Sequence, residues 1–131
     1  MTFDDVAALA LELPEAVEGT SYGSRAWKVK GKLFAWERPF RKADLERFGE
    51  EPVPGGPILG LAVDDLEEKE VVLSQRRPGF FTIPHFDGYA AVLVQLDAAD
   101  DDDVREAIVD AWLCKAPEAL AGAYLDRESG S

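Results

Sequence analysis

The stretch from Phe80 to Leu96, FFTIPHFDGYAAVLVQL, most constrains how this chain can fold. Two apolar runs, Phe80–Ile83 and Tyr89–Leu96, flank a segment with proline, aspartate and glycine, which is the pattern of strand, turn and strand. The second run is nearly continuous in Ala, Val and Leu, as in a central strand covered on both faces. We therefore expect the rest of the chain to pack around this hairpin.

Length and cysteine content limit the class of protein. A chain of 131 residues is expected to form one domain, residues 1–131, with a core that needs no disulfide or metal. One cysteine, Cys114, and one histidine, His85, allow no internal disulfide and none of the usual zinc ligand sets. The acidic N-terminus differs from a signal peptide, and no apolar run approaches the roughly 18 residues of a membrane span. The sequence predicts a cytoplasmic protein without metal, cofactor or membrane partner, and it leaves the oligomeric state open.

Charge is distributed unevenly along the chain. The formal net charge of −12 favours solubility and disfavours general attraction to nucleic acid. Residues 25–42, however, hold seven basic residues and one acidic residue, Glu37, and the rest of the chain then has a net charge of −18. The basic residues are Arg25, Lys28, Lys30, Lys32, Arg38, Arg41 and Lys42. Half of all positive charge therefore lies in one segment.

The N-terminal part is predicted to form a helix, a loop and a hairpin. Apolar residues three and four apart predict an amphipathic helix between a Thr2–Asp5 capping pair and Pro14. Residues 15–24 are predicted as a loop. Two strands, Arg25–Val29 and Leu33–Glu37, then flank a glycine turn, with tryptophan and valine on one face of the first strand and lysines on the other. On the second strand either face could be the apolar one.

The middle of the chain is predicted to contain a long excursion and a second helix. Residues 39–57 hold four prolines and are predicted as a long mobile loop, with one helical turn at Asp44–Phe48. A short strand follows at Ile58–Val63. Asp64 is expected to begin a helix whose apolar side includes Leu66 and Leu73 and which stops at Pro78-Gly79.

Two helices are predicted after the Phe80–Leu96 hairpin. The acidic run Asp100–Asp103 is expected to lie at a helix start, followed by a buried stripe at Val104, Ala107, Ile108, Ala111 and Trp112. A last helix is expected to begin at Pro117, and its inward residues are Leu120, Tyr124 and Leu125. Residues 127–131 are expected to fray. The element order predicts an α+β fold, an antiparallel sheet with helices packed mainly on one face.

Few residues offer catalytic chemistry. His85 lies in a turn, where it is either a proton carrier or a residue bonded to nearby backbone beside Asp87. Cys114 falls on a helical spacing with small residues, which favours a core role over a reactive thiolate. The chain has no nucleophile elbow, no glycine-rich phosphate loop and no calcium loop. We therefore predict that it is not an enzyme.

The basic hairpin is the feature that charge placement singles out. Arg25, Lys28, Lys30 and Lys32, with Trp27 and Trp36 interleaved, could follow a phosphate backbone and stack an exposed base or wedge a groove. Arg76 and Arg77 could help to grip an anion if they lie near this hairpin. The alternative is a solvated strand face whose tryptophans are core and whose lysines offset the acidic helices. Two further alternatives are a protein-interaction module and a small-molecule pocket under residues 39–57, lined by Trp36, Phe80, Phe81 and His85.

Five segments, taken in order, resemble the MmcQ/YjbR family over about Phe3 to Leu125. They are ALELPEAVEGTSYG, WKVKGKLFAW, ILGLAVDDLEEKEVVL, FFTIPHFDGYAAVLVQL and DAWLCKAPEALAGAYL. The resemblance implies a small bacterial α+β protein of the double-wing DNA-binding type, with a fold similar to that of secretion chaperones, which bind polypeptide. It implies no enzymatic activity.

The same resemblance implies which hairpins act as the two wings. The first wing would be the hairpin about Gly31, with Lys28, Lys30 and Lys32, and the second would span His85–Gly88. The second wing carries Asp87 and no lysine or arginine. No helix presents Arg, Asn or Gln at base-reading spacing, so the implied contact with DNA is to phosphates without sequence readout.

Overall fold

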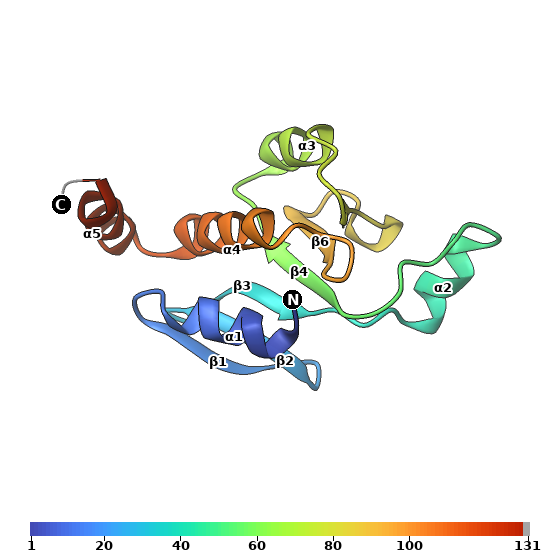
Figure 1. The fold of residues 1–131 in the computed structure, drawn as a ribbon, viewed down its shortest axis with the longest axis horizontal. Coiled ribbons are helices and arrows are strands. Elements are labelled where there is room, and N and C mark those ends of the chain that lie inside the picture. The colour runs from blue at the N-terminus through green and yellow to red at the C-terminus, as the bar shows by residue number, and fades with distance from the viewer. Residues whose placement is uncertain (130–131) are drawn as a thin grey trace.

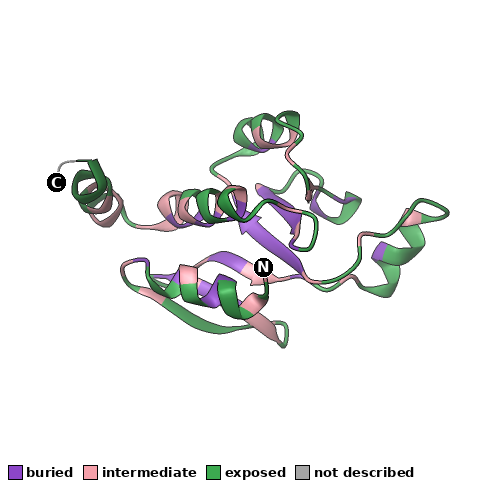
Figure 2. Cartoon of the chain, viewed as in Figure 1, coloured by how far each residue is buried: buried purple, intermediate pink, exposed green. Residues whose placement is uncertain are grey.

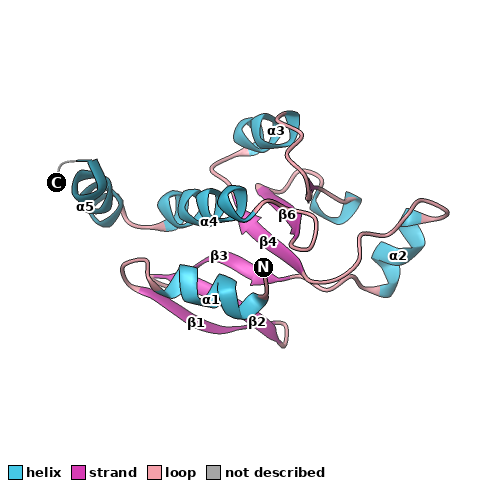
Figure 3. Cartoon of the chain, viewed as in Figure 1, coloured by secondary structure: helices cyan, strands magenta, loops and turns pink. Residues whose placement is uncertain are grey.

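A six-stranded antiparallel sheet in the order β1-β2-β3-β4-β6-β5 organises the computed structural model, which describes residues 1–129 (Figures 1 and 3). The strands are β1 (Ala16–Ser21), β2 (Ser24–Val29), β3 (Lys32–Glu37), β4 (Ile58–Ala62), β5 (Phe80–Phe81) and β6 (Ala91–Gln95). The helices are α1 (Phe3–Leu11), α2 (Lys42–Phe48), α3 (Leu66–Ser74), α4 (Asp101–Lys115) and α5 (Glu118–Ser129), with a short 3-10 helix, η1, at Pro84–Phe86. The predicted α+β class is confirmed.

The predicted loop at residues 15–24 is wrong, because Ala16–Ser21 forms the edge strand β1. It pairs with β2 through a two-residue turn, Tyr22-Gly23, whose φ values of 50° and 80° are both positive. The β2–β3 turn, Lys30-Gly31, repeats this geometry with φ values of 49° and 81°. Such turns match the right-handed twist of the flanking strands. The predicted basic hairpin is therefore confirmed, and it lies inside a three-stranded meander.

One face of the sheet is covered by α1 and α4 (Figure 1). The predicted Thr2–Asp5 capping box begins α1, and Asp100 caps α4 by accepting a hydrogen bond from the Asp102 N–H. The predicted α4 stripe is largely confirmed, since Val104, Ile108, Ala111 and Trp112 are buried and Ala107 is partly buried. The Trp112 indole N–H donates to the Pro14 carbonyl over 3.0 Å, which ties α4 to the end of α1.

The central strands β4 and β6 are buried on both faces (Figure 2). The Phe80–Leu96 stretch pairs β5 with β6 as predicted, although β5 has only two residues and η1 fills the connection. On the face opposite α1, a second apolar cluster forms around Ile58, Ile83, Phe86, Ala91 and Leu93. This face is covered along only part of its width.

Residues 39–57, predicted as a long loop with one helical turn at Asp44–Phe48, contain the seven-residue helix α2 at that place and fold back onto the second cluster. The Phe40 ring lies 5.3 Å from that of Phe48 and 6.2 Å from that of Phe81. Aromatic pairs at these distances add packing energy beyond the area they bury. The two phenylalanines therefore anchor the segment at both ends of α2.

Helix α3 differs from its prediction at its start and on its inner side. Asp65, one residue later than expected, caps the helix by accepting a hydrogen bond from the Glu68 N–H over 2.8 Å. Leu66 is exposed and Leu73 is partly buried, whereas the fully enclosed residue is Lys69. The carbonyl groups of Phe86 and Tyr89 lie beneath α3 at this point and accept hydrogen bonds from the Lys69 ammonium. An apolar side chain at this position would leave them unsatisfied.

Helix α5 projects from one end of the molecule (Figure 1). Tyr124 packs on Trp112 with ring centroids 5.1 Å apart, and Leu120 is partly buried. Leu125 was predicted to face inward but is exposed. Of the tail predicted to fray, residues 127–129 continue α5, and residues 130–131 lie outside the described part of the chain. Within residues 1–129, no helix has the length and apolar content needed to cross a bilayer.

Candidate functional site

Arg25 and Trp27, two of the predicted nucleic-acid contacts, are occupied by interactions within the fold. The Arg25 guanidinium donates to both carboxylate oxygens of Glu18 and lies 3.0 Å from Asp4. Trp27 is fully buried, and its indole N–H donates to Glu18 over 3.0 Å. The hydrogen bonds from Arg25, opposed by partial burial and reinforced by Trp27, lower the pKa of Glu18. This cluster joins β1, β2 and α1 and leaves Trp27 no exposed ring face.

Lys28, Lys30 and Lys32 differ in how free their charges are. Lys30, in the β2–β3 turn, is exposed with its Nζ 3.7 Å from a Glu15 carboxylate oxygen. Lys28 is half-buried on β2 and Lys32 is exposed on β3, and neither forms an ion pair with any residue from 1 to 129. The hairpin therefore presents two uncompensated cations and a third that is loosely paired.

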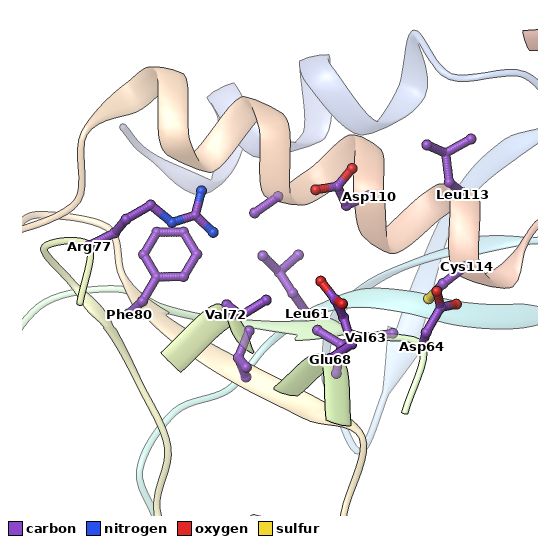
Figure 4. A pocket seen from close by; sticks show the side chains of 13 residues that line it. Leu61, Val63, Asp64, Glu68, Val72, Arg77, Phe80, Asp110, Leu113 and Cys114 are labelled. Carbon is purple, nitrogen blue, oxygen red and sulfur yellow. The ribbon is translucent and has the colours of Figure 1, made fainter. Parts of the chain in front are cut away.

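Arg76 and Arg77 lie far from this hairpin. They precede β5, whereas Lys28 lies on β2, and the strands β3, β4 and β6 separate the two in the sheet. Arg77 extends over the Phe80 ring, with its guanidinium carbon 4.3 Å from the ring centroid (Figure 4). Its Nη1 also lies 3.9 Å from an Asp103 carboxylate oxygen. Arg76 is exposed. The structure does not bring these arginines and the basic hairpin together.

The predicted pocket residues separate into three places. Trp36 and His85 line one groove on the face of the sheet opposite α1 and α4. Phe80 points to the other face, into a smaller pocket of about 320 Å³ between α3, α4 and the sheet (Figure 4). Phe81 packs against Phe40 in the second apolar cluster. A pocket that contains all four side chains does not form.

The groove that holds Trp36 and His85 has a volume of about 810 Å³ and combines aromatic rings with positive charge. Its aromatic residues are Tyr22, Trp36, His85, Phe86 and Tyr89. Its basic residues are Lys32, Arg38, Arg41 and Lys115, and among the described lining residues the one carboxylate is Glu37. A concave site of this size with rings and a few polar groups has the usual properties of a ligand site. We call it the open-face groove.

A buried ion pair fixes one wall of the open-face groove. Arg38 is 5% exposed and Asp44 is 3% exposed, and the Arg38 Nη2 lies 3.0 Å from the Asp44 Oδ2. Asp44 also accepts a hydrogen bond from the Arg41 N–H over 2.9 Å at the start of α2. Burial raises the pKa of Asp44, but the Arg41 N–H and the Arg38 charge outweigh it, so the net pKa is lowered. This carboxylate therefore joins the end of β3 to α2.

Lys69 fixes the opposite wall. Its buried ammonium donates to the carbonyl oxygens of Phe86 and Tyr89, over 2.6 and 3.0 Å. Burial lowers the pKa of Lys69, and the charge of Asp87 opposes this. Because the two carbonyls flank the turn after η1, the lysine orders the segment that carries His85 and Tyr89. His85 is exposed, and its ring meets the edge of Phe86 with centroids 5.0 Å apart.

Several groove residues are absent from the sequence prediction. Tyr22 and Tyr89 were assigned to a loop and to the start of a strand, and Lys115 ends a helix on the other face. Arg41 was counted only as part of the basic segment. One signal could have identified Tyr22, since a Tyr-Gly pair between two short polar runs is a turn that displays the tyrosine. The convergence of these residues depends on the sheet order and has no local signal.

The smaller pocket is lined by apolar side chains with Asp64, Glu68 and Asp110 at its rim and Cys114 at one end (Figure 4). Within residues 1–129, no group of three or more His, Cys, Asp or Glu side chains is arranged to hold a metal ion. The Cys114 thiol donates to the Ala111 carbonyl over 3.2 Å. Burial raises the pKa of this thiol to about 11, and the nearby charge of Lys115 opposes the shift.

Cys114 is expected to react with Ellman's reagent at pH 8 on the order of 100-fold more slowly in the folded protein than in the urea-unfolded chain. The thiolate is the nucleophile, and the raised pKa of the folded state lowers the fraction of Cys114 that is ionised. The chain has one cysteine, so the absorbance change reports this residue alone. Equal rates in the two states would contradict a buried, protonated thiol.

Comparison with known proteins agrees with this fold. Residues 11–114 match the family model named YjbR. The chain is 44% identical over 127 residues to uncharacterized proteins of Mycobacterium bovis and Mycobacterium tuberculosis, with 95% of each chain covered. The crystal structure of Deinococcus radiodurans protein DR2400, described by the domain name DUF419, has a TM-score of 0.59 at 19% identity over 99% of this chain and 81% of that one, a likeness in fold alone. The chain belongs to the YjbR family, as its sequence segments indicated.

Proposed function

We propose that this protein is a cytoplasmic, non-enzymatic nucleic-acid-binding protein that contacts phosphates through the β2–β3 hairpin. The observation that carries the proposal is that Lys28 and Lys32 remain free of ion pairs with residues 1–129 in a chain of net charge −12. Glu18, on the neighbouring strand β1, pairs with Arg25 on the face that carries Trp27. Free cations on an acidic protein mark the surface that can approach a polyanion.

The affinity of this contact is expected to depend on salt concentration and not on the base sequence. Two lysines on neighbouring strands bind phosphate oxygens as point charges and do not read base edges. Binding through two phosphate contacts should weaken about tenfold between 50 and 200 mM salt, because binding releases counterions from the nucleic acid and this release is less favourable at higher salt. Arg25 and Trp27 support the hairpin from within the fold.

The test is fluorescence anisotropy of labelled single-stranded and duplex DNA with a Lys28→Glu/Lys32→Glu variant. We expect the variant to lose most of its affinity and of its salt dependence. The matched control is Arg105→Glu/Arg127→Glu, which makes the same change in net charge at exposed positions of α4 and α5. This variant should change binding little. Equal loss in both variants would mean that net charge alone matters and would remove the hairpin as the contact surface.

A protein-interaction or chaperone-like function is the second candidate. The edge strand β1 pairs only with β2 among the described strands, and its Val17 side chain is exposed. An unpaired edge can accept a further strand from a polypeptide. This function predicts partner binding that changes little between 50 and 200 mM salt and is unaffected by Lys28→Glu/Lys32→Glu.

A further inference from the structure

Tyr22 has no role in folding that explains its position. It occupies a turn site with a φ of 50°, a conformation that favours Gly, Asn or Asp and disfavours a bulky side chain. Its side chain is 93% exposed, so it contributes no core packing in return. The Arg41 guanidinium carbon lies 5.6 Å from the centroid of the ring. A strained, exposed aromatic residue at the mouth of a groove is a feature of a binding site.

Trp36 supplies the floor of the same groove. Its indole lies against Gly60, where a Cβ atom would overlap the ring. The indole N–H groups of Trp27 and Trp112 donate to Glu18 and to the Pro14 carbonyl, whereas that of Trp36 forms no hydrogen bond within residues 1–129. The floor therefore offers an aromatic surface and a free donor. Tyr89, 64% exposed, stands on the opposite rim.

Three cations from separate elements line the same groove, with Arg41 beside Tyr22 and Lys32 at the opposite end of β2. Lys32 belongs to β3, Arg41 precedes α2 and Lys115 ends α4, and none of them forms an ion pair with the described residues. Arg38 is neutralised by Asp44. The Glu37 carboxylate accepts from the Arg25 backbone N–H over 3.4 Å. The groove is thus complementary to an anion that carries a flat ring.

We infer that the open-face groove binds a single-stranded nucleic acid, with one unstacked base against Tyr22 and Trp36 and successive phosphates of the strand at Arg41, Lys32 and Lys115. Proteins that bind single strands without sequence preference combine aromatic rings, on which bases stack, with a positively charged groove that follows the phosphates. A duplex hides the faces of its bases, so it cannot fill the groove. The inference deepens the proposed function and rests on it, since Lys32 belongs to both the hairpin and the groove.

Tyr22→Asn is the decisive variant, because asparagine suits the positive φ of the turn while the ring is lost. By anisotropy at 50 mM salt, a thymidine 12-mer should bind wild type more tightly than a duplex of equal length. We expect Tyr22→Asn to weaken binding of the 12-mer about fivefold or more and to leave duplex binding unchanged. Tyr22→Phe, which retains the ring, should bind like wild type.

Intrinsic fluorescence gives a second readout. Trp27 and Trp112 are fully buried, so quenching by the 12-mer should come from Trp36 and should disappear in Trp36→Phe. A duplex bound as tightly as the 12-mer, with no effect of Tyr22→Asn, would overturn the groove inference and leave the proposed function intact. Equal quenching by thymidine monophosphate and the 12-mer would show a mononucleotide site and overturn the inference of a single-strand site, whereas the proposed function is tested separately by the Lys28→Glu/Lys32→Glu variant. No quenching by either would overturn the groove inference.

Discussion

Replacing Asp44 with asparagine is expected to lower the free energy of unfolding by about 3–5 kcal/mol, because it leaves the Arg38 charge buried without a partner. The two side chains are almost fully enclosed, and the atoms Nη2 and Oδ2 lie 3.0 Å apart. Arg38 also lies over the Phe86 ring at 5.4 Å, so its guanidinium cannot move to water without disturbing the second apolar cluster. The loss should appear in urea denaturation at pH 7 as a lower midpoint.

Two controls separate the buried charge from other effects of the substitution. Asp65→Asn makes the same chemical change at an exposed helix cap, where asparagine serves about as well as aspartate, and should be nearly neutral. The double variant Arg38→Met/Asp44→Leu removes both charges and should be more stable than Asp44→Asn. A loss below about 1 kcal/mol for Asp44→Asn would show that Arg38 reaches solvent.

The ion pair also predicts a response to acid. The pKa of Asp44 in the folded protein is below its ordinary value of 3.8. The ionised carboxylate therefore stabilises the fold fully above that value, and its contribution is lost as the pH falls through the folded-state pKa. Asp44→Asn should remove this part of the acid sensitivity.

The shape of the open-face groove depends on this framework of buried charges. Asp44 positions Arg41 over Tyr22, and Lys69 orders the turn that carries Tyr89. Buried charges cost desolvation energy that an apolar pair would avoid. Because Asp44 and Lys69 lie in opposite walls of one groove, they hold its exposed rings and cations in place on an otherwise acidic protein.

The elements with strong periodicity could be predicted from the sequence. The α4 stripe repeats every three to four residues, and its buried side chains lie where the pattern placed them. The β2–β3 hairpin was predictable from its glycine turn. Strand β1 was not, because most of its residues are exposed and show no apolar alternation; pairing with β2 holds it in the sheet.

The inner face of β3 could not be assigned for a specific reason. Phe34 and Ala35 are both fully buried, although consecutive residues of a regular strand point to opposite faces. A bulge in β3 itself breaks that alternation: Trp27 and Lys28 pair with Ala35 and Leu33, which leaves Phe34 without a partner on β2. The sequence left both faces of this strand open because each alternating set contains apolar residues, and side-chain directions beyond a bulge do not follow from spacing.

The open-face groove lay beyond sequence reasoning because its parts are distant in the chain. Tyr22, Arg41 and Lys115 belong to three separate connections or helix ends, and only the sheet order brings them together. The sequence identified the local excess of positive charge. It assigned Trp27 and Trp36 similar roles, whereas one is core and the other lies in a groove.

Trp27→Ala is expected to lower the free energy of unfolding by about 3–5 kcal/mol, as for other large aromatic residues removed from a core. The indole is fully buried, stacks on Phe3 with centroids 6.4 Å apart, and donates to Glu18. Urea denaturation of Trp27→Phe should show a smaller loss, because the ring volume is mostly retained while the N–H is removed. If Trp27 has only this structural role, Trp27→Phe should bind the thymidine 12-mer like wild type under conditions where both are folded, whereas Trp36→Phe should bind it more weakly. A Trp27→Phe protein of normal stability that lost DNA binding would instead place this ring in the contact surface, and the hairpin would have to open for DNA to reach it.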